Sequence, residues 1–146
     1  MPSLEAYRRS LDYSYAPGLF PSMEALTRRP ELVRRVLLHS KAEHSDATER
    51  LLAICQSHNT RVETADRALA RLSGKENVFA AAVFAKEQAT LAQERNHLVL
   101  HQPSDGGNLG TMLRTALGFG YVDIAIIRPA ADAFDPRVVR ASMGAV

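Results

Sequence analysis

Tryptophan is absent from this sequence, and cysteine occurs once, at Cys55. A single cysteine excludes an intramolecular disulfide and agrees with a reducing, cytoplasmic compartment. Because Cys55 follows Leu51 and Leu52 on an expected helix, we interpret it as a small core residue and not as a reactive thiol. The fold is therefore expected to depend on packing alone.

Long apolar runs are also missing. Residues 1–18 carry charges throughout, so we expect neither a signal peptide nor a membrane-spanning segment there, and no membrane partner. The formal net charge is only +2, from 18 basic and 16 acidic residues. Such a small surplus does not by itself indicate a nucleic-acid partner, so the positions of the arginines have to decide that question.

Apolar residues make up 46% of the 146 positions, which is enough for one ordinary domain or two very small ones. After an extension over residues 1–17, residues 18–86 alternate between helix and strand patterns. The expected elements are a helix over 23–28 capped by Ser22, a strand over 32–39, a helix capped by Ser45, a strand over 60–64 with Val62 inward, a helix capped by Asp66, and a strand over 79–84. The alanines of the last segment would suit a helix equally. This order predicts a small three-layer α/β sandwich.

A second unit is expected over residues 97–146, after a polar linker over 87–96 that could also be a short helix. Leu98 to Leu100 form a short apolar run typical of a buried strand. Gly106 and Gly107 then predict a turn, and an apolar stripe predicts a helix over 109–118 with Asn108 as its N-cap. A strand over 122–128 and a helix over 136–142 complete the beginning of a parallel sheet.

Arg114 projects from the polar face of the expected 109–118 helix, where a long cationic side chain could reach a ligand near the turn. A solvated surface arginine is an equally good interpretation from helix periodicity alone. Asp105, Asp132 and Asp135 occur in nearby loops and could serve as acid–base groups, although caps and turn formers are the commoner use. His97 and His101 lie on one face of a strand, which does not match the spacing of a zinc site, and we expect no metal.

The motif Asn108-x-Gly110-x3-Arg114-Thr115-Ala116-x2-Phe119-Gly120 resembles the first signature of the SpoU (TrmH-like) RNA 2′-O-ribose methyltransferases, within the SPOUT superfamily. Residues 140–145, RASMGA, resemble the segment that follows the next strand and helix in that family. Residues 18–86 resemble its RNA substrate-binding domain, which shares its fold with ribosomal proteins that bind bent RNA. Six residues would then have structural roles in turns or motifs: Gly106, Gly107, Gly110, Gly120, Arg140 and Gly144.

The resemblance implies methyl transfer from S-adenosylmethionine to a ribose 2′-hydroxyl of ribosomal or transfer RNA, in a homodimer. In that family the arginine at the position of Arg114 activates the hydroxyl, and the asparagine at the position of Asn108 supports it. A guanidinium with a pKa above about 12 is a poor base near neutral pH. The physically easier role for Arg114 is therefore to bind the ribose and its phosphate and to stabilise the developing alkoxide.

Arginines cluster around Pro30, and each guanidinium could bind an RNA phosphate through paired hydrogen bonds. Charge pairs beside a proline turn are also common solubility residues, so both interpretations stay open. The predicted RNA-binding residues are Arg28, Arg29, Arg34 and Arg35.

Two later family motifs that build the cofactor-binding knot are missing from the sequence. Residues 97–146 are therefore expected to be a partial SPOUT methyltransferase domain that lacks the C-terminal knot. We expect residues 1–146 alone neither to bind S-adenosylmethionine nor to methylate RNA. The alternative function is a non-catalytic RNA-binding module.

Overall fold

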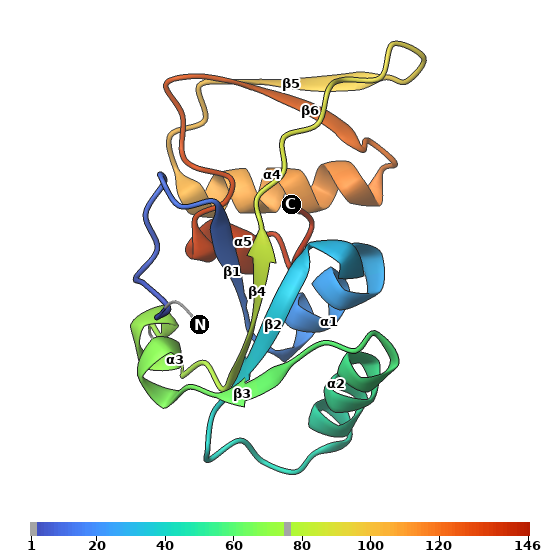
Figure 1. The fold of residues 1–146 in the computed structure, drawn as a ribbon. Coiled ribbons are helices and arrows are strands. Elements are labelled where there is room, and N and C mark those ends of the chain that lie inside the picture. Colours follow the sequence, from blue (N-terminus) through green and yellow to red (C-terminus); the bar gives the residue numbers. More distant parts are fainter. Residues whose placement is uncertain (1–2, 75–76) are drawn as a thin grey trace.

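The computed structural model describes residues 3–74 and 77–146, which form two separate sheets (Figure 1). The larger sheet has the strand order β1-β4-β2-β3, and the smaller one pairs β5 with β6. The elements are β1 (Tyr13–Pro17), α1 (Leu19–Arg28), the 3-10 helix η1 (Pro30–Leu32), β2 (Val33–Leu38), α2 (Asp46–Ser57), β3 (Val62–Thr64), α3 (Asp66–Leu72), β4 (Ala80–Ala85), β5 (His97–His101), α4 (Gly106–Gly118), β6 (Asp123–Ile127) and α5 (Pro136–Ala141). Within the described residues, no helix is both long and apolar enough to cross a bilayer.

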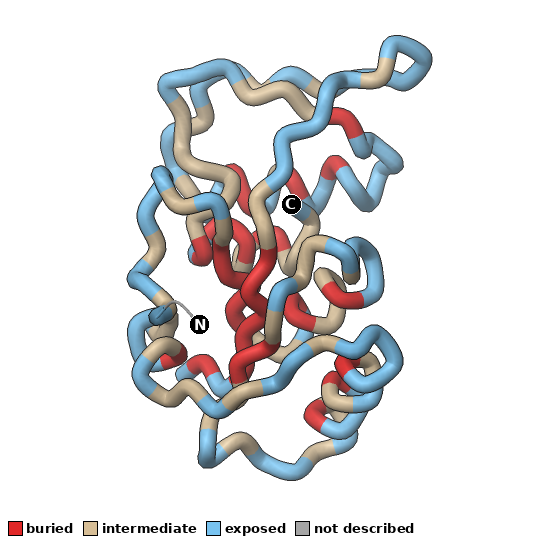
Figure 2. The backbone as a smooth tube through the Cα atoms, viewed as in Figure 1, coloured by how far each residue is buried: buried red, intermediate tan, exposed pale blue. Residues whose placement is uncertain are grey.

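Strand β4 is the centre of the larger sheet and of the molecule (Figure 2). It pairs antiparallel with both β1 and β2, while β2 pairs parallel with β3. Ala80, Ala81 and Ala82 are completely buried, because layers on both faces of the sheet pack against them. Small side chains let those layers approach closely, and the segment is a strand and not the alternative helix.

Helices cover both faces of the larger sheet, which confirms the predicted three-layer α/β sandwich. On one face, Leu26 of α1 packs with Leu51 and Cys55 of α2, so Cys55 is a core residue as expected. On the other face, Leu69 of α3 packs with Leu37 of β2. Each cluster is a continuous apolar core, and together they account for most of the buried side chains.

Residues 13–17 form β1, so the expectation that residues 1–17 are an extension outside the sheet is wrong for this part. Tyr13 pairs with Ala85 and Pro17 with Ala81 across the antiparallel ladder. The sequence pattern did not predict this strand because a polar residue, Ser14, occupies one of its buried positions. Ser14 is completely buried, and its hydroxyl donates a hydrogen bond to the carbonyl oxygen of Phe134.

Of the three helix caps predicted within residues 18–86, two are wrong and one is confirmed. Ser45 accepts a hydrogen bond from Thr48 N at 3.2 Å and caps α2 as expected. Helix α1 begins earlier than predicted, so Ser22 is inside it, where its hydroxyl accepts from Ala82 N at 2.9 Å. Asp66 is the first residue of α3 and not its cap, because its carboxylate accepts from Ser40 N at 2.8 Å.

Some residues expected to face inward are exposed. Val62 lies on the short edge strand β3 and is 37% exposed. In the smaller sheet, α4 covers only one face, so Leu98 and Leu100 point toward it while Val99 is 55% exposed. The expected fully buried strand is therefore buried on one side only. Residues 86–96 contain no helix, which removes that alternative for the linker.

Helix α5 lies between the two sheets and belongs to both cores (Figure 1). Val138 packs against Leu109 and Leu113 of α4, whereas Val139 packs with the α1 and α2 residues of the first core. The linker is also anchored to the smaller sheet, because the Asp123 carboxylate lies 3.0 Å from Arg95 Nε. These contacts fix the position of α4 relative to the larger sheet.

Candidate functional site

Helix α4 begins at Gly106, three residues before the predicted start. Asp105 is its N-cap, and its Oδ1 atom accepts a hydrogen bond from Asn108 N at 2.7 Å. Asn108 is therefore not the cap, and Gly106 and Gly107 are helical residues and not a turn. The aspartate satisfies an amide that the first helical turn leaves unpaired, which is why the helix can start at two glycines.

The glycines of α4 allow it to cross α5 at close range. A Cβ atom added to Gly110 would lie 2.6 Å from Ala141 Cβ and 2.8 Å from the carbonyl oxygen of Val138. A Cβ atom on Gly106 would lie 3.1 Å from Val138 Cγ2. Gly110 therefore has a packing role that no larger residue can fill without moving one of the two helices.

Asn108 and Arg114 are both exposed on α4. Six residues separate them, which places them about 9 Å apart along the helix axis and about a third of a turn apart around it. Thr111 lies between them, and its hydroxyl donates to the carbonyl oxygen of Gly107 at 3.0 Å. Within residues 3–74 and 77–146, the Arg114 guanidinium has no hydrogen-bond or ion-pair partner, so it is available to a ligand.

A glycine in the left-handed conformation follows each of the helices α4 and α5. After α4, Gly120 has φ +84°, its N–H donates to Leu117 O at 3.0 Å, and the next amide, of Tyr121, donates to Ala116 O at 2.9 Å. After α5, Gly144 also has φ +84°, and a Cβ there would lie 3.1 Å from the Glu24 Cβ. Their left-handed conformation lets backbone amides after each helix donate to its last carbonyl oxygens. The two glycines therefore have a structural role in the motifs.

Arg140 lies on α5, half-buried and engaged in contacts of its own. It lines a cavity of about 400 Å³ together with Arg71 and Arg137. This position is away from Asn108 and Arg114, since neither of them lines the cavity. Arg140 thus lines a cavity together with residues of α3.

The predicted basic cluster does not form one open stripe. Arg34 and Arg35 are neighbours on β2 at a β-bulge, because the pairing with β4 shifts its register between Val33 and Arg35. Arg35 is only 12% exposed and lies 2.8 Å from Glu63, whereas Arg34 is exposed and lies 2.8 Å from Asp12. The Arg34 hydrogen bond holds the pKa of Asp12 below its usual value.

The other two arginines of the cluster are also paired with carboxylates. Arg28 Nε lies 3.4 Å from Glu24, one helical turn away. Arg29 binds both Glu31 and Glu87, and its hydrogen bond lowers the pKa of Glu31. These carboxylates are solvent-exposed or nearly so, so an incoming phosphate can compete for the guanidinium groups at small cost.

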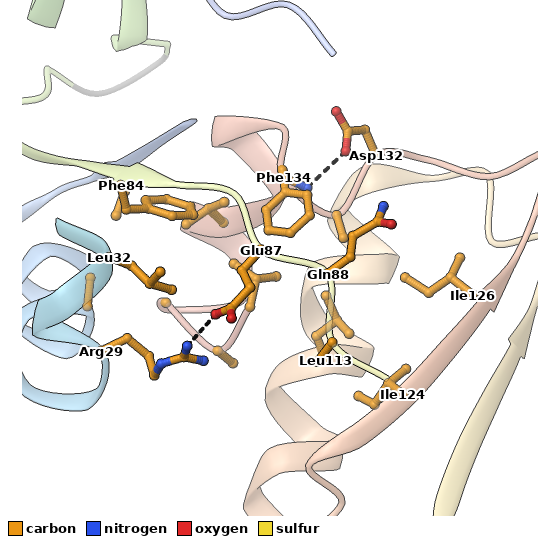
Figure 3. A pocket seen from close by; sticks show the side chains of 18 of the residues that line it. Arg29, Leu32, Phe84, Glu87, Gln88, Leu113, Ile124, Ile126, Asp132 and Phe134 are labelled. Atoms are coloured by element: carbon orange, nitrogen blue, oxygen red, sulfur yellow. Dashed lines mark hydrogen bonds and ion pairs between the residues drawn. The ribbon is translucent and has the colours of Figure 1, made fainter. Parts of the chain in front are cut away.

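A cavity of about 500 Å³ lies between parts of the two halves of the chain, and Figure 3 shows side chains that line it. Its walls include residues of α1, β4, the linker, α4, β6 and the loop before α5, and Arg29 reaches Glu87 at one side. The labelled lining residues are Arg29, Leu32, Phe84, Glu87, Gln88, Leu113, Ile124, Ile126, Asp132 and Phe134. No local sequence pattern marks this cavity, because elements that are distant in sequence build it.

The three loop aspartates are caps and turn formers. Asp105 caps α4, and Asp135 caps α5 by accepting from Arg137 N at 2.9 Å. Burial raises the pKa of Asp135, but the hydrogen bonds and charge of Arg137 outweigh burial, so its pKa lies below the usual value. Asp132 accepts from Phe134 N at 3.0 Å. In the described part of the chain, no three His, Cys, Asp or Glu residues gather as metal ligands would.

Comparisons with known proteins find a family model that matches the region containing α4. Residues 95–146 match the family model described as the SpoU rRNA Methylase family. The mouse (Mus musculus) protein "rRNA methyltransferase 3, mitochondrial" is 44% identical over 48 residues, which is 33% of this chain and 12% of that protein. The matched region contains α4 and both motifs.

Solved structures resemble nearly the whole chain. The SpoU methyltransferase AviRb from Streptomyces viridochromogenes, in complex with AdoMet, aligns with a TM-score of 0.75 at 22% identity and covers 96% of this chain and 56% of its own. An RNA 2′-O ribose methyltransferase aligns with a TM-score of 0.68 at 21% identity, covering 94% and 54%. Identity at this level shows a shared fold alone. The chain spans about half the length of these solved relatives.

Proposed function

We propose that this chain, whose residues 95–146 belong to the SpoU methylase family, takes part in S-adenosylmethionine-dependent methylation of a ribose 2′-hydroxyl in ribosomal or transfer RNA. The observation that supports this most directly is the exposed, unpaired Arg114 guanidinium on α4, one and two-thirds turns from Asn108. The names of the relatives support the reaction class, since they include rRNA methylation, 2′-O ribose methylation and the AdoMet cofactor.

Arg114 supplies positive charge where negative charge develops on the 2′-oxygen. A guanidinium stays protonated near neutral pH, so it stabilises the alkoxide that develops as the hydroxyl proton passes to water, and it binds the adjacent phosphate. The Asn108 side-chain amide can donate to and accept from the ribose hydroxyls, which would orient the sugar. Both groups act on the RNA side of the reaction.

S-adenosylmethionine would supply the methyl group. The cavities of about 500 and 400 Å³ are not lined by Asn108 or Arg114, so neither of them joins a cofactor to these two residues. We therefore assign no residue of this chain to the cofactor.

The larger sheet offers RNA a second kind of surface besides its exposed arginines. Phe20 and Phe79 are 51% and 42% exposed, and the hydrogen bond from Gly18 N to Ala80 O, at 2.7 Å, brings their segments to the same end of the sheet. His39 lies edge-on to Phe79 with ring centroids 5.5 Å apart. Unstacked RNA bases bind such rings by stacking. Together with Arg28 and Arg29 at the opposite end of α1, these rings would hold an extended RNA.

A homodimer and a cytoplasmic location are further parts of the proposal. The end of α4 and the following loop expose Phe119 by 79% and Val122 by 54%, a patch that a second copy could cover. Sedimentation equilibrium tests the dimer directly. A Phe119→Ser variant should shift the chain toward monomer, whereas an unchanged association constant would contradict an interface at this patch.

Ribose methylation can be tested by incubating a protein that carries the complete catalytic domain, including residues 95–146, with labelled S-adenosylmethionine and ribosomal or transfer RNA. A 2′-O-methyl group protects its phosphodiester from alkaline hydrolysis, which distinguishes it from base methylation. RNA binding without incorporated label would instead favour the alternative, a non-catalytic RNA-binding module. Arg114→Ala serves as the matched inactive variant.

A further inference from the structure

Three segments that are distant in sequence meet beside the loop before α5. The Tyr7 hydroxyl donates a hydrogen bond to Oδ2 of Asp132, 125 positions further along the chain. Lys86, at the end of β4, places its Nζ atom 3.3 Å from the Tyr7 hydroxyl and donates to the carbonyl oxygen of Arg9 at 2.8 Å. The N-terminal segment is thereby bonded to both halves of the molecule.

Aromatic rings and a second cation surround this contact. Lys86 Nζ lies 5.1 Å from the Tyr7 ring centroid and 5.7 Å from that of Phe134, within range of cation–π attraction. Arg9 donates to the carbonyl oxygen of Ala130 at 3.4 Å. The Asp132 side chain is 17% exposed. Burial, followed by the Asp132 hydrogen bond, raises the pKa of Tyr7, so its hydroxyl remains a donor at every ordinary pH.

Further hydrogen bonds connect the loop that contains Asp132 to the segment before α4. Asp132 Oδ1 accepts from Phe134 N at 3.0 Å, which fixes the loop (Figure 3). Ala131 N donates to the carbonyl oxygen of Pro103 at 2.7 Å. Pro103 lies two residues before Asp105, the cap of α4. Asp132 therefore belongs to the loop that supports the N-terminus of the helix carrying Asn108 and Arg114.

Apolar packing between the two halves is incomplete at this point. The cavity of about 500 Å³ adjoins Asp132 and Phe134, so on this side the halves are joined across a gap and not by a continuous core. Where apolar contact is missing, polar contacts carry a larger share of the relative placement. The Tyr7 hydroxyl and the Asp132 carboxylate are well suited to this role, since a charged acceptor makes the stronger kind of hydrogen bond.

We propose that Tyr7 and Asp132 form an interdomain latch, and that the latch positions the N-terminus of α4, with Asn108 and Arg114, relative to the larger sheet. Tyr7 is a positioning residue that contacts no substrate. The expected effect of the latch on catalysis rests on the proposed methyl transfer. The expected effect of the latch on the position of the loop before α5 does not depend on that proposal.

Amide hydrogen exchange on the 146-residue chain tests the placement. Tyr7→Phe keeps the ring and removes the hydroxyl, so the Ala131 amide should exchange about tenfold faster, while the Val36 amide in the core strand β2 should not change. Tyr13→Phe is the matched control, because the Tyr13 hydroxyl accepts from Glu5 N at 3.1 Å within the N-terminal segment. An unchanged Ala131 rate, or equal acceleration at Val36, would overturn the latch.

Variants of the acceptor test the pair, and kinetics test its consequence. Asp132→Asn keeps an acceptor oxygen and should retain slow Ala131 exchange. Asp132→Ala also removes the acceptor of Phe134 N, so it should accelerate Ala131 exchange at least as much as Tyr7→Phe. Adding Tyr7→Phe to Asp132→Ala should give no further acceleration, and additive effects of the two substitutions would contradict the pairing.

In methyl-transfer assays of a protein that carries the complete catalytic domain, Tyr7→Phe should lower kcat several-fold and leave the KM for RNA unchanged. If the wild-type form of that protein methylates nothing, the proposed function is refuted but not the latch, which the exchange rates decide.

Discussion

Gly110 on α4 and Ala141 on α5 lie so close together that a Cβ atom on Gly110 would stand 2.6 Å from Ala141 Cβ. Two motifs, the Asn108–Gly120 segment and the Arg140–Ala145 segment, therefore meet at this helix crossing. The crossing links the exposed face of α4 to the core of the larger sheet, because the neighbouring Val139 packs there.

Gly110→Ala should destabilise the chain by about 1–3 kcal/mol, the usual cost of overpacking, because Ala141 Cβ and the backbone of α5 must move. Chemical denaturation would measure the change. Gly118→Ala, on the same helix, is the control, since a Cβ there meets nothing within 4 Å and should be neutral or stabilise by about 0.5 kcal/mol. Equal midpoints for the two variants would contradict the crossing geometry.

Arg35 should matter for stability and the exposed arginines for RNA affinity. Arg35→Ala removes a mostly buried guanidinium from Glu63 and should cost about 2 kcal/mol, measured by denaturation, with the salt dependence of RNA binding unchanged.

Replacing Arg28, Arg29 and Arg34 together with alanine should leave stability nearly unchanged. Each lost phosphate contact should reduce the slope of log affinity against log salt by about 0.7–0.9. Fluorescence anisotropy at several salt concentrations gives the slope. If the triple variant keeps the wild-type slope, these arginines are ordinary surface residues.

Local patterns in the sequence predicted most of the elements because each pattern needs only its own neighbours. The strand His97–His101 and the alternation from α1 to β4 are of this kind. Strand β1 was missed because its buried Ser14 is stable only when bonded to the Phe134 carbonyl oxygen, 120 positions away. A polar residue gives no sign of such burial from its own sequence context.

The candidate site was predicted only in part for the same reason. Arg114 was identified from the motif, and its exposed position agrees with that choice. The start of α4 was misplaced because two glycines usually indicate a turn, whereas here Asp105 caps them as helix. The ion pairs of the arginine cluster with Asp12, Glu63 and Glu87 could not be predicted locally, because these carboxylates are remote in sequence.

Arg114→Ala should abolish most methyl transfer in a protein that carries the complete catalytic domain, while its stability stays within about 0.5 kcal/mol of wild type, as is usual for an exposed side chain. Radiolabel transfer to RNA measures the first quantity and thermal unfolding the second. Arg114→Lys keeps the charge but loses the planar guanidinium, so partial activity is expected if phosphate binding by paired hydrogen bonds matters. Wild-type turnover in Arg114→Ala would remove this residue from the mechanism.

Residues 1–146 alone should not bind S-adenosylmethionine measurably, even though Asn108 and Arg114 are exposed and correctly folded. Neither of the two cavities described above is lined by either residue, and the outer face of the β5–β6 sheet leaves Val99 and Ile127 uncovered. Methyl transfer requires both reactants to be held together, so RNA contacts without a bound donor give no rate advantage. Isothermal titration calorimetry with the methyl donor measures the affinity. Micromolar binding to the verified 146-residue chain would mean that a cofactor site exists within these two sheets.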